Sequence, residues 1–409
     1  MFADRPRAAG LFLPIALVIS IAGTFTAIRT LYNNRLRYRE TDFYEYYTWS
    51  WQLRLGVDPW LPQASALAPP NPFNKPVASC NYTPPFTILF EPLTLLKPQA
   101  AYWVWQTLQM ACLFGALWLL MRELRPPPQS GATMAAVGAV LLFPHSHWAL
   151  YEAQPTFLLL LLIVASWRFE RHELPFWAGL MLALAALLKL YPAAIGGYFL
   201  FRRRWRTIAW TSLLFAAGVL VFGLSYQLEF FRYGVPRFTE PWLHQGRQVG
   251  ITSNLHWMLA SKYGDLVPAG IETLRVILSA ALSVAVVAAA VAITMKAAGE
   301  GENDGILLSI WIMTALMLSP IAWAHELPLI TPFYLFVAAR LLRGARADTT
   351  GLVLMSMGLL GFVVPYFSTV VRHAHIYFFA MVATFVAACM LAVRSGGNQQ
   401  RMPVAGNWD

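Results

Sequence analysis

Asp42 is the acidic residue whose position most favours chemistry. It lies about a dozen residues after the first long apolar segment, roughly residues 10–28, in the run 41–47 (TDFYEYY). That segment is long enough to cross a bilayer, so the sequence predicts Asp42 at the membrane surface among aromatic side chains. A carboxylate there needs only modest tuning of its pKa to act as a general base toward a hydroxyl group. The alternative is a solvated loop acid beside interfacial aromatic residues.

Four basic side chains could bind a phosphate group. Arg37 and Arg39 precede Asp42, Lys189 interrupts the apolar run 187–192 (LLKLYP), and His325 follows the end of another apolar segment. A cation placed inside an apolar hairpin is costly and is usually functional or reaches toward the interface. Fixed cations and histidine N–H groups can stabilise a phosphate that gains negative charge. The alternatives are lipid head-group contacts for the arginines and a structural interfacial role for His325.

The composition indicates an integral membrane protein. The chain has 409 residues, of which 58% are hydrophobic and 12% are charged, whereas an ordinary soluble domain has about 25% charged residues. The formal net charge of +10 does not indicate a nucleic-acid partner, because Arg and Lys cluster beside apolar segments. Contacts with the phosphates of membrane lipids explain the basic clusters better.

The apolar segments predict an all-α fold with about 12 transmembrane helices. They lie near residues 10–30, 99–121, 132–150, 155–167, 175–188, 190–201, 207–226, 273–295, 305–320, 327–342, 350–368 and 376–393. The segment 86–96 is too short to span a bilayer and contains Pro92, so it is expected to lie in the interface or to re-enter the membrane.

The distribution of Arg residues predicts the orientation. Short connections near residues 122–125, 168–171, 202–206 and 340–346 are rich in Arg, whereas those near 145–155 and 321–327 contain no Lys or Arg. The positive-inside rule then places both termini in the cytoplasm. Two larger loops, about 31–98 and 227–272, face outward, and Asp42 belongs to the first. We expect one transmembrane domain over residues 1–393 and a polar cytoplasmic tail over 394–409.

The sequence does not predict a metal site or a bound cofactor. The pairs His145/His147 and His373/His375 have no carboxylate or Cys cluster nearby in sequence, and neither outward loop contains an Asp-x-Asp pair. Glycine-rich nucleotide-binding patterns are also missing. We therefore expect a metal-independent protein.

Several short motifs, in this order, resemble glycosyltransferase family 87. They are residues 42–47 (DFYEYY), 56–59 (GVDP), 82–85 (YTPP), 92–93 (PL), Gln154 at the start of a Leu-rich helix, 188–192 (LKLYP) and 319–325 (SPIAWAH). The resemblance covers roughly residues 10–345. The family comprises bacterial multispanning enzymes of the GT-C fold that use polyprenyl-phosphate sugars, with mannosyltransferases as the known example. This chain departs from the family pattern at Ala324, where an acidic residue is common, and at residues 252–257 (TSNLHW) of the second outward loop.

This resemblance implies an inverting transfer of one sugar, mannose by family likeness, from a polyprenyl phosphate to a glycolipid or glycan. The reaction would take place on the outer face of the bacterial cytoplasmic membrane. Asp42 would be the general base, and the phosphate of the donor would meet Lys189, His325, Arg37 and Arg39. The same likeness suggests that five further residues contact the substrates: Tyr44, Tyr82, Gln154, Asn254 and Trp323. The donor is a substrate, so no cofactor is implied.

Two other functions remain open from the sequence. A transporter or flippase for lipid-linked or small polar substrates would also use many spans and broken helices, although acids within the predicted spans are nearly absent. A non-catalytic scaffold of an envelope complex is the third possibility. If Asp42 is not the base, Glu45, Asp58 and Glu326 are the next candidates.

Overall fold

The computed structural model describes residues 6–34, 37–67, 71–73, 75, 77, 80–124, 137–236, 248–260, 267–297, 302–320, 322–342, 349–367 and 376–399. Over these residues the chain is helical, and its β pairing is one isolated antiparallel bridge between Gln248 and Trp323. The predicted all-α class is therefore confirmed. Every predicted span coincides, over its described residues, with one or two helical elements.

The helical elements fall into two compact units. Unit 1 comprises Met1–Ala193, Arg206–Trp242 and His325–Leu329, and unit 2 comprises Ala194–Trp205, Leu243–Ala324 and Ile330–Asp409. The prediction of a single transmembrane domain over residues 1–393 stays a prediction. Of the predicted polar tail, residues 400–409 lie outside the described residues.

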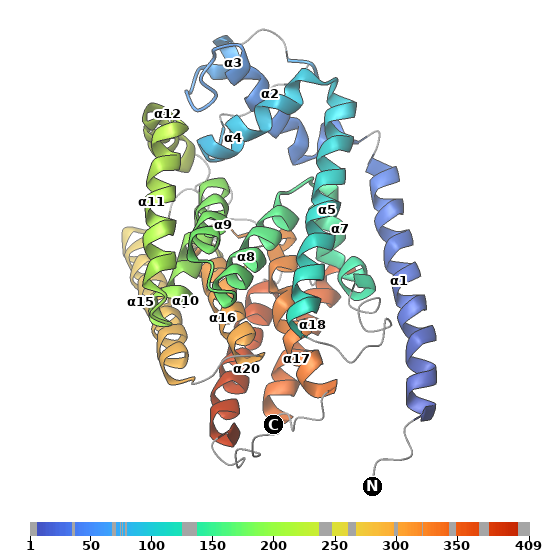
Figure 1. Cartoon of the computed structure of the whole chain (residues 1–409). Helices are drawn as coiled ribbons and strands as arrows, with labels where there is room; N and C mark the ends of the chain where they lie inside the picture. Colours follow the sequence, from blue (N-terminus) through green and yellow to red (C-terminus); the bar gives the residue numbers. More distant parts are fainter. Residues whose placement is uncertain are drawn as a thin grey trace. The chain divides into compact units, whose positions relative to one another are not determined.

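Unit 1 contains the N-terminal helices and the short elements of the first predicted outward loop (Figure 1). Its elements are α1 (Pro6–Asn34), η1 (Tyr38–Glu40), α2 (Asp42–Arg54), α3 (Ala64–Leu67), α4 (Pro84–Phe90), η2 (Glu91–Leu95), α5 (Pro98–Leu124), α7 (Pro144–Tyr151), α8 (Thr156–Arg171), α9 (Pro175–Leu188), most of α11 (Trp205–Val221), α12 (Leu224–Glu229), the π-helix η4 (Phe230–Gly234) and most of η6 (Ala324–Ile330).

Unit 2 contains the remaining helices. They are α10 (Gly196–Phe201), α14 (Ile251–Ala260), α15 (Ala269–Lys296), α16 (Glu302–Leu318), α17 (Thr331–Leu342), α18 (Thr349–Phe367) and α20 (Ile376–Gln399). Within this unit α18 packs along α20, and α16 contacts α15, α17 and α20. The buried side chains of α16, among them Ile306, Leu307 and Ile310, form the centre of its core.

Three helices of the described chain are long and apolar enough to cross a membrane. They are α5, α15 and residues Ile376–Val393 of α20. Two bent pairs, α7 with α8 and α11 with Leu224–Gly234, pass the same test only when each pair is joined, and their bends are 115° and 97°. If each bent pair is counted as one span, the described chain has up to five candidate spans. Helix α9, with 14 residues, is shorter than the roughly 20 residues that a span needs. The predicted number of about 12 spans therefore stays a prediction.

A cluster of aromatic rings fastens α2 to α4 and α5 within unit 1. The ring centroid of Phe43 lies 5.3 Å from that of Tyr102 on α5, and Tyr46 lies 5.0 Å from Phe86 on α4. Phe90 and Trp105 complete the contact between α4 and α5, also at 5.0 Å. Edge-to-face pairs of this kind stabilise a core beyond the apolar area that they bury. They hold the first turn of α2, and with it Asp42, in one position.

Candidate active site

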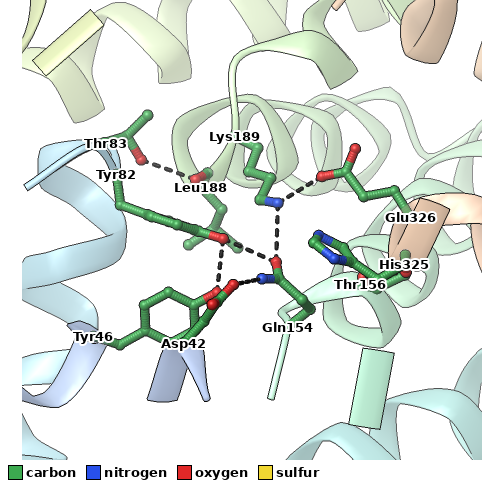
Figure 2. Close-up of polar contacts among 10 residues, drawn as sticks. All are labelled: Asp42, Tyr46, Tyr82, Thr83, Gln154, Thr156, Leu188, Lys189, His325 and Glu326. Carbon is green, nitrogen blue, oxygen red and sulfur yellow. Dashed lines mark hydrogen bonds and ion pairs between the residues drawn. The ribbon is translucent and has the colours of Figure 1, made fainter. Parts of the chain in front are cut away.

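Six polar side chains from distant parts of the sequence meet within unit 1 (Figure 2). They are Asp42, Tyr46, Tyr82, Gln154, Lys189 and Glu326, and His325 lies beside them. With the exception of Tyr46, none of these residues lies in the middle of a regular α-helix. Asp42 begins α2, and the others lie before α4, between α7 and α8, after α9 and in η6. The site is therefore built where helices start or break, because backbone irregularity there lets polar side chains converge.

Asp42 is placed by the start of α2. The preceding Thr41 is extended, with φ −109° and ψ 167°, and its hydroxyl donates to the carbonyl of Tyr38 at 3.1 Å. The first backbone N–H groups of a helix carry partial positive charge, which favours an acid in the first turn. The amide nitrogen Nε2 of Gln154 donates to Asp42 Oδ2. The carboxylate is thus held by its own helix and by a residue more than one hundred positions away in sequence.

Gln154 is placed by a tight turn between α7 and α8. Ala153 adopts a left-handed backbone conformation, with φ 56°, which costs a residue with a Cβ roughly 1–2 kcal/mol. Its carbonyl accepts a hydrogen bond from Trp105 Nε1 at 2.7 Å, and Gln106 Nε2 donates to Leu150 O at 2.8 Å. These two side chains of α5 hold the turn and therefore the position of Gln154.

Lys189 is placed by the end of α9. Its backbone is extended, with φ −143° and ψ 139°, so the helix stops at Leu188. The last carbonyls of a helix lack partners within it, and here the hydroxyl of Thr83 lies 2.7 Å from Leu187 O and 2.9 Å from Leu188 O. This contact ties the loop that carries Tyr82 to the helix end that carries Lys189.

We predict that Thr83→Val lowers the free energy of unfolding by about 1–2 kcal/mol, because two buried carbonyls lose their donor while the side-chain volume is kept. Thr83→Ser retains the hydroxyl and should recover most of that loss. Thermal unfolding of the purified protein in detergent compares the two variants with the unmodified protein. Equal midpoints for the valine and serine variants would show that the hydroxyl does not stabilise the end of α9.

Lys189 forms a buried ion pair at the centre of the site. Its Nζ donates to Glu326 Oε1 at 2.6 Å and to Gln154 Oε1 at 3.2 Å. The side chains of Lys189 and Glu326 are 16% and 2% exposed. Burial alone would lower the pKa of Lys189, but the carboxylate of Glu326 raises it above its ordinary value. The lysine therefore remains a cation at neutral pH.

Two carboxyl groups on α2 have different protonation states. Burial raises the pKa of Asp42 to about 6, although Lys189, Gln154 and Tyr46 each act to lower it. Burial, together with the charges of Asp42 and Glu152, raises the pKa of Glu45 to about 8. Near pH 7, Asp42 is therefore mostly ionised and Glu45 mostly protonated. Of the two, only Asp42 combines an ionised form at neutral pH with a raised pKa, which is the state that a general base requires.

His325 is buried beside Lys189 in its neutral form. Burial lowers its pKa well below the ordinary value, and the charge of Lys189 acts in the same direction. The ring of Trp148 packs against the imidazole edge-to-face, at 5.9 Å between centroids. The backbone carbonyl of His325 accepts a hydrogen bond from Thr156 Oγ1 at 3.2 Å. A neutral imidazole can donate one hydrogen bond without adding charge to the site.

The structure brings five of the ten predicted site residues together in one cluster of unit 1. Asp42, Tyr82, Gln154, Lys189 and His325 belong to the cluster in Figure 2. The roles that the sequence assigned to them stay predictions, because a shared location does not establish a role.

Three of the other five predicted residues belong to unit 1 without joining the contacts of that cluster, and two belong to unit 2. Arg37 and Arg39 are exposed, and the guanidinium of Arg39 lies 5.9 Å from the ring of Tyr38. The hydroxyl of Tyr44 donates to Lys75 O at 3.2 Å. Asn254 and Trp323 belong to unit 2, where the amide of Asn254 donates to backbone carbonyls of residues 248 and 250. Their predicted substrate contacts also stay predictions.

The sequence reasoning missed Tyr46 as a member of the site. The sequence predicts the stretch 41–47 as part of an outward loop, and in a loop the spacing of residues does not show which side chains share a face. In the helix α2, residues i and i+4 lie on the same face, so Tyr46 follows Asp42 by one turn. The aromatic run after Asp42 was the available signal. Thr83 belongs to the motif 82–85, but the sequence does not predict its contact with the end of α9.

A metal site is not visible in the described part of the chain. It contains no group of three or more His, Cys, Asp and Glu side chains that could hold a metal ion. His373 and His375 lie outside the described residues. The expectation of a metal-independent protein stays a prediction.

Comparison with known proteins gives two findings. A model of glycosyltransferase family 87 matches residues 81–320. The chain is also 29% identical, over 296 residues, to the polyprenol-phosphate-mannose-dependent alpha-(1-2)-phosphatidylinositol pentamannoside mannosyltransferase of Mycolicibacterium smegmatis (strain ATCC 700084 / mc(2)155). That alignment covers 69% of this chain and 68% of the relative. The family match includes Tyr82, Gln154 and Lys189, whereas Asp42 and His325 fall outside it.

Proposed function

Since the chain belongs to glycosyltransferase family 87, and is therefore a membrane enzyme that uses polyprenyl-phosphate sugars, we propose that it transfers mannose to a hydroxyl of an envelope glycolipid or glycan. The donor sugar is suggested by the relative, whose name specifies polyprenol-phosphate-mannose. The same name includes a phosphatidylinositol pentamannoside, which is a glycolipid, and this supports a glycolipid acceptor. The observation that carries the proposal is the meeting of Asp42 with the cation Lys189 in one cluster.

The proposed reaction is a single inverting displacement. Asp42 takes the proton from the acceptor hydroxyl, the acceptor oxygen forms a bond to the anomeric carbon, and the bond from that carbon to the phosphate oxygen breaks. The leaving prenyl phosphate keeps the bonding electrons. A phosphate is a good leaving group and requires no general acid, which agrees with a site in which Asp42 is the one ionised carboxylate not paired with a cation at hydrogen-bond distance: Glu326 is paired with Lys189. Lys189 and His325 face the phosphate and stabilise the charge that it gains.

The proposed location is the outer face of the cytoplasmic membrane. Asp42 belongs to a predicted outward loop, and the Arg-rich connections predict cytoplasmic termini. Prenyl chains remain in the hydrocarbon layer, so a site at the membrane surface meets the phosphate where it leaves that layer. The transporter alternative lacks comparable support, because the family to which the chain belongs consists of transferases.

The function is tested with the full-length protein in liposomes. A radiolabelled polyprenyl-phosphate mannose is supplied with a bacterial membrane lipid extract, and the label is followed into the acceptor fraction. We expect transfer by the unmodified protein, and other prenyl-phosphate sugars extend the test if mannose is not used. Failure with every prenyl-phosphate sugar, or export of the intact donor without bond cleavage, would contradict the proposal.

The pH dependence of transfer is a further prediction. A general base works only when it is ionised, so the rate of transfer should rise with pH and reach half its maximum near pH 6, where Asp42 titrates. Burial raises this pKa and Lys189 lowers it, so Lys189→Met should move the acidic limb to higher pH. Initial rates measured between pH 4.5 and 8 check both statements. A limb near pH 4 would show that Asp42 is solvated during catalysis.

A further inference from the structure

Four side chains of the site form a closed ring of polar contacts. Gln154 Nε2 donates to Asp42 Oδ2, and Gln154 Oε1 lies 2.9 Å from the hydroxyl of Tyr82. The hydroxyls of Tyr82 and Tyr46 are 2.7 Å apart, and Tyr46 in turn contacts the carboxyl of Asp42. Lys189 is only a donor and contacts Gln154 Oε1, so the orientation of the amide is fixed. Figure 2 shows the contacts of Gln154 with Asp42 and Tyr82, and the contact between Tyr82 and Tyr46.

The number of protons in this ring depends on the state of Asp42. Three contacts join oxygen atoms: Asp42 to Tyr46, Tyr46 to Tyr82, and Tyr82 to Gln154. Each such contact needs one proton, and each tyrosine supplies one. With Asp42 ionised there are two protons for three contacts. With Asp42 protonated there are three, and every contact can be a hydrogen bond.

The direction of the hydrogen bonds therefore differs between the two states. An ionised Asp42 accepts from Tyr46, and Tyr46 accepts from Tyr82, while Lys189 still donates to Gln154. A protonated Asp42 donates to Tyr46, which donates to Tyr82, which donates to Gln154. The change requires only rotation of the hydroxyl groups of Tyr46 and Tyr82, and no proton has to leave these residues.

We propose that Tyr46 and Tyr82 form a hydroxyl relay that positions Asp42 and reverses its hydrogen bonds when Asp42 takes the proton of the acceptor. This inference rests on the proposed function, since it concerns the same base. Both tyrosines are positioning residues, because they act through Asp42. The relay keeps the buried carboxyl hydrogen-bonded before and after the proton transfer, so neither state bears the cost of an unsatisfied buried polar group.

Other charged and titratable groups act on Asp42 directly or through a neighbour. Lys189 after α9 and Glu45 on α2 interact electrostatically with Asp42. Glu152, before the turn that carries Gln154, acts on Glu45, and His325 and Glu326 in η6 interact with Lys189. None of these side chains is replaced when a tyrosine is changed to phenylalanine, although Tyr82→Phe also removes the hydrogen bond between the Tyr82 hydroxyl and Lys189. A displacement of the titration of Asp42 in such a variant therefore reports the hydroxyl itself.

Removal of the Tyr46 hydroxyl and removal of the Tyr82 hydroxyl should displace the pKa of Asp42 in opposite directions. Tyr46→Phe removes the charge-assisted bond to the ionised carboxylate, so the pKa of Asp42 should rise. Tyr82 takes part in two hydrogen bonds of the relay when Asp42 is protonated and in one when Asp42 is ionised. Tyr82→Phe therefore destabilises the protonated state more, so the pKa of Asp42 should fall. Each displacement should be about one pH unit, the value that a bond to a charged group produces. The double variant should titrate like Tyr46→Phe alone, because Tyr82 reaches the carboxyl oxygen through Tyr46.

The experiment is infrared difference spectroscopy of the purified full-length protein between pH 4 and 8. The carboxyl band of Asp42 is identified by its loss in Asp42→Asn, and it is followed in each tyrosine variant. Tyr47→Phe is the matched control: Tyr47 lies on α2, and its hydroxyl donates to Leu96 O at 2.9 Å. This variant should leave the band unchanged.

Opposite displacements for Tyr46→Phe and Tyr82→Phe would support the relay. Displacements in the same direction, no displacement, or a double variant equal to the sum of the single ones would overturn it. The titration needs no substrate, so it decides the inference even if sugar transfer is not observed. Transfer measured on the same preparations tests the proposed function separately.

Discussion

Asp42→Asn should reduce sugar transfer by about 10²- to 10⁴-fold, the contribution that a positioned general base makes to an enzymatic rate. The asparagine side chain has the same shape, and its carbonyl oxygen can still accept a hydrogen bond from Gln154 Nε2. It cannot take a proton from the acceptor. We therefore expect a folded protein with a low turnover number and a nearly unchanged KM for the donor.

Two other acids of the same predicted loop provide matched controls. Glu45 has a pKa of about 8, so it is mostly protonated at pH 7, and Glu45→Gln reproduces both its shape and its charge. Asp58 Oδ1 accepts a hydrogen bond from the backbone N–H of Trp60 at 2.9 Å, a turn that asparagine forms equally well. Both variants should keep transfer within a few-fold of the unmodified protein.

The comparison of the three variants separates the possible bases. Initial rates are measured at pH 7 in liposomes, and helical content is checked by circular dichroism. If Asp42→Asn keeps its rate, Asp42 is not the base. If Glu45→Gln or Asp58→Asn loses its rate as strongly, the corresponding acid takes its place in the mechanism.

The fold could be predicted from the sequence where hydrophobicity decides the structure. The segments 99–121, 175–188 and 273–295 lie on α5, α9 and α15 with nearly the same bounds, because long apolar runs can satisfy their backbone groups only as helices. The helix α2 was not predicted. Its residues are mixed polar and aromatic, and its position follows from the aromatic rings of α4 and α5 that it packs against.

The site could be predicted only in part for a related reason. Asp42, Lys189 and His325 stand out in the sequence because they interrupt or follow apolar runs. Tyr46 does not stand out, because it is one of several tyrosines in this stretch. Only the helical turn of α2 places it on the same face as Asp42. The pairing of Lys189 with Glu326 joins residues 137 positions apart. Such a contact depends on where α9 and η6 end, and a single sequence does not contain that information.

Lys189→Met should produce the second large effect, on both stability and transfer. It removes the cation while leaving the buried carboxylate of Glu326 without its partner at 2.6 Å. Breaking a buried ion pair by removing one member costs about 3–5 kcal/mol. The variant should therefore unfold at a lower temperature in detergent. If Lys189 also holds the phosphate of the donor, transfer should fall further than the loss of folded protein explains.

The double variant Lys189→Met/Glu326→Gln separates these two contributions. A neutral amide in place of the Glu326 carboxylate needs no counter-charge, so the double variant should recover most of the lost stability. It should not recover transfer, because the cation that would stabilise the leaving phosphate is still missing. Recovery of both would show that Lys189 serves only to neutralise Glu326. Recovery of stability alone, together with a raised KM for the donor, would assign the cation to the phosphate, since a purely structural lysine has no reason to change donor binding once the fold is restored.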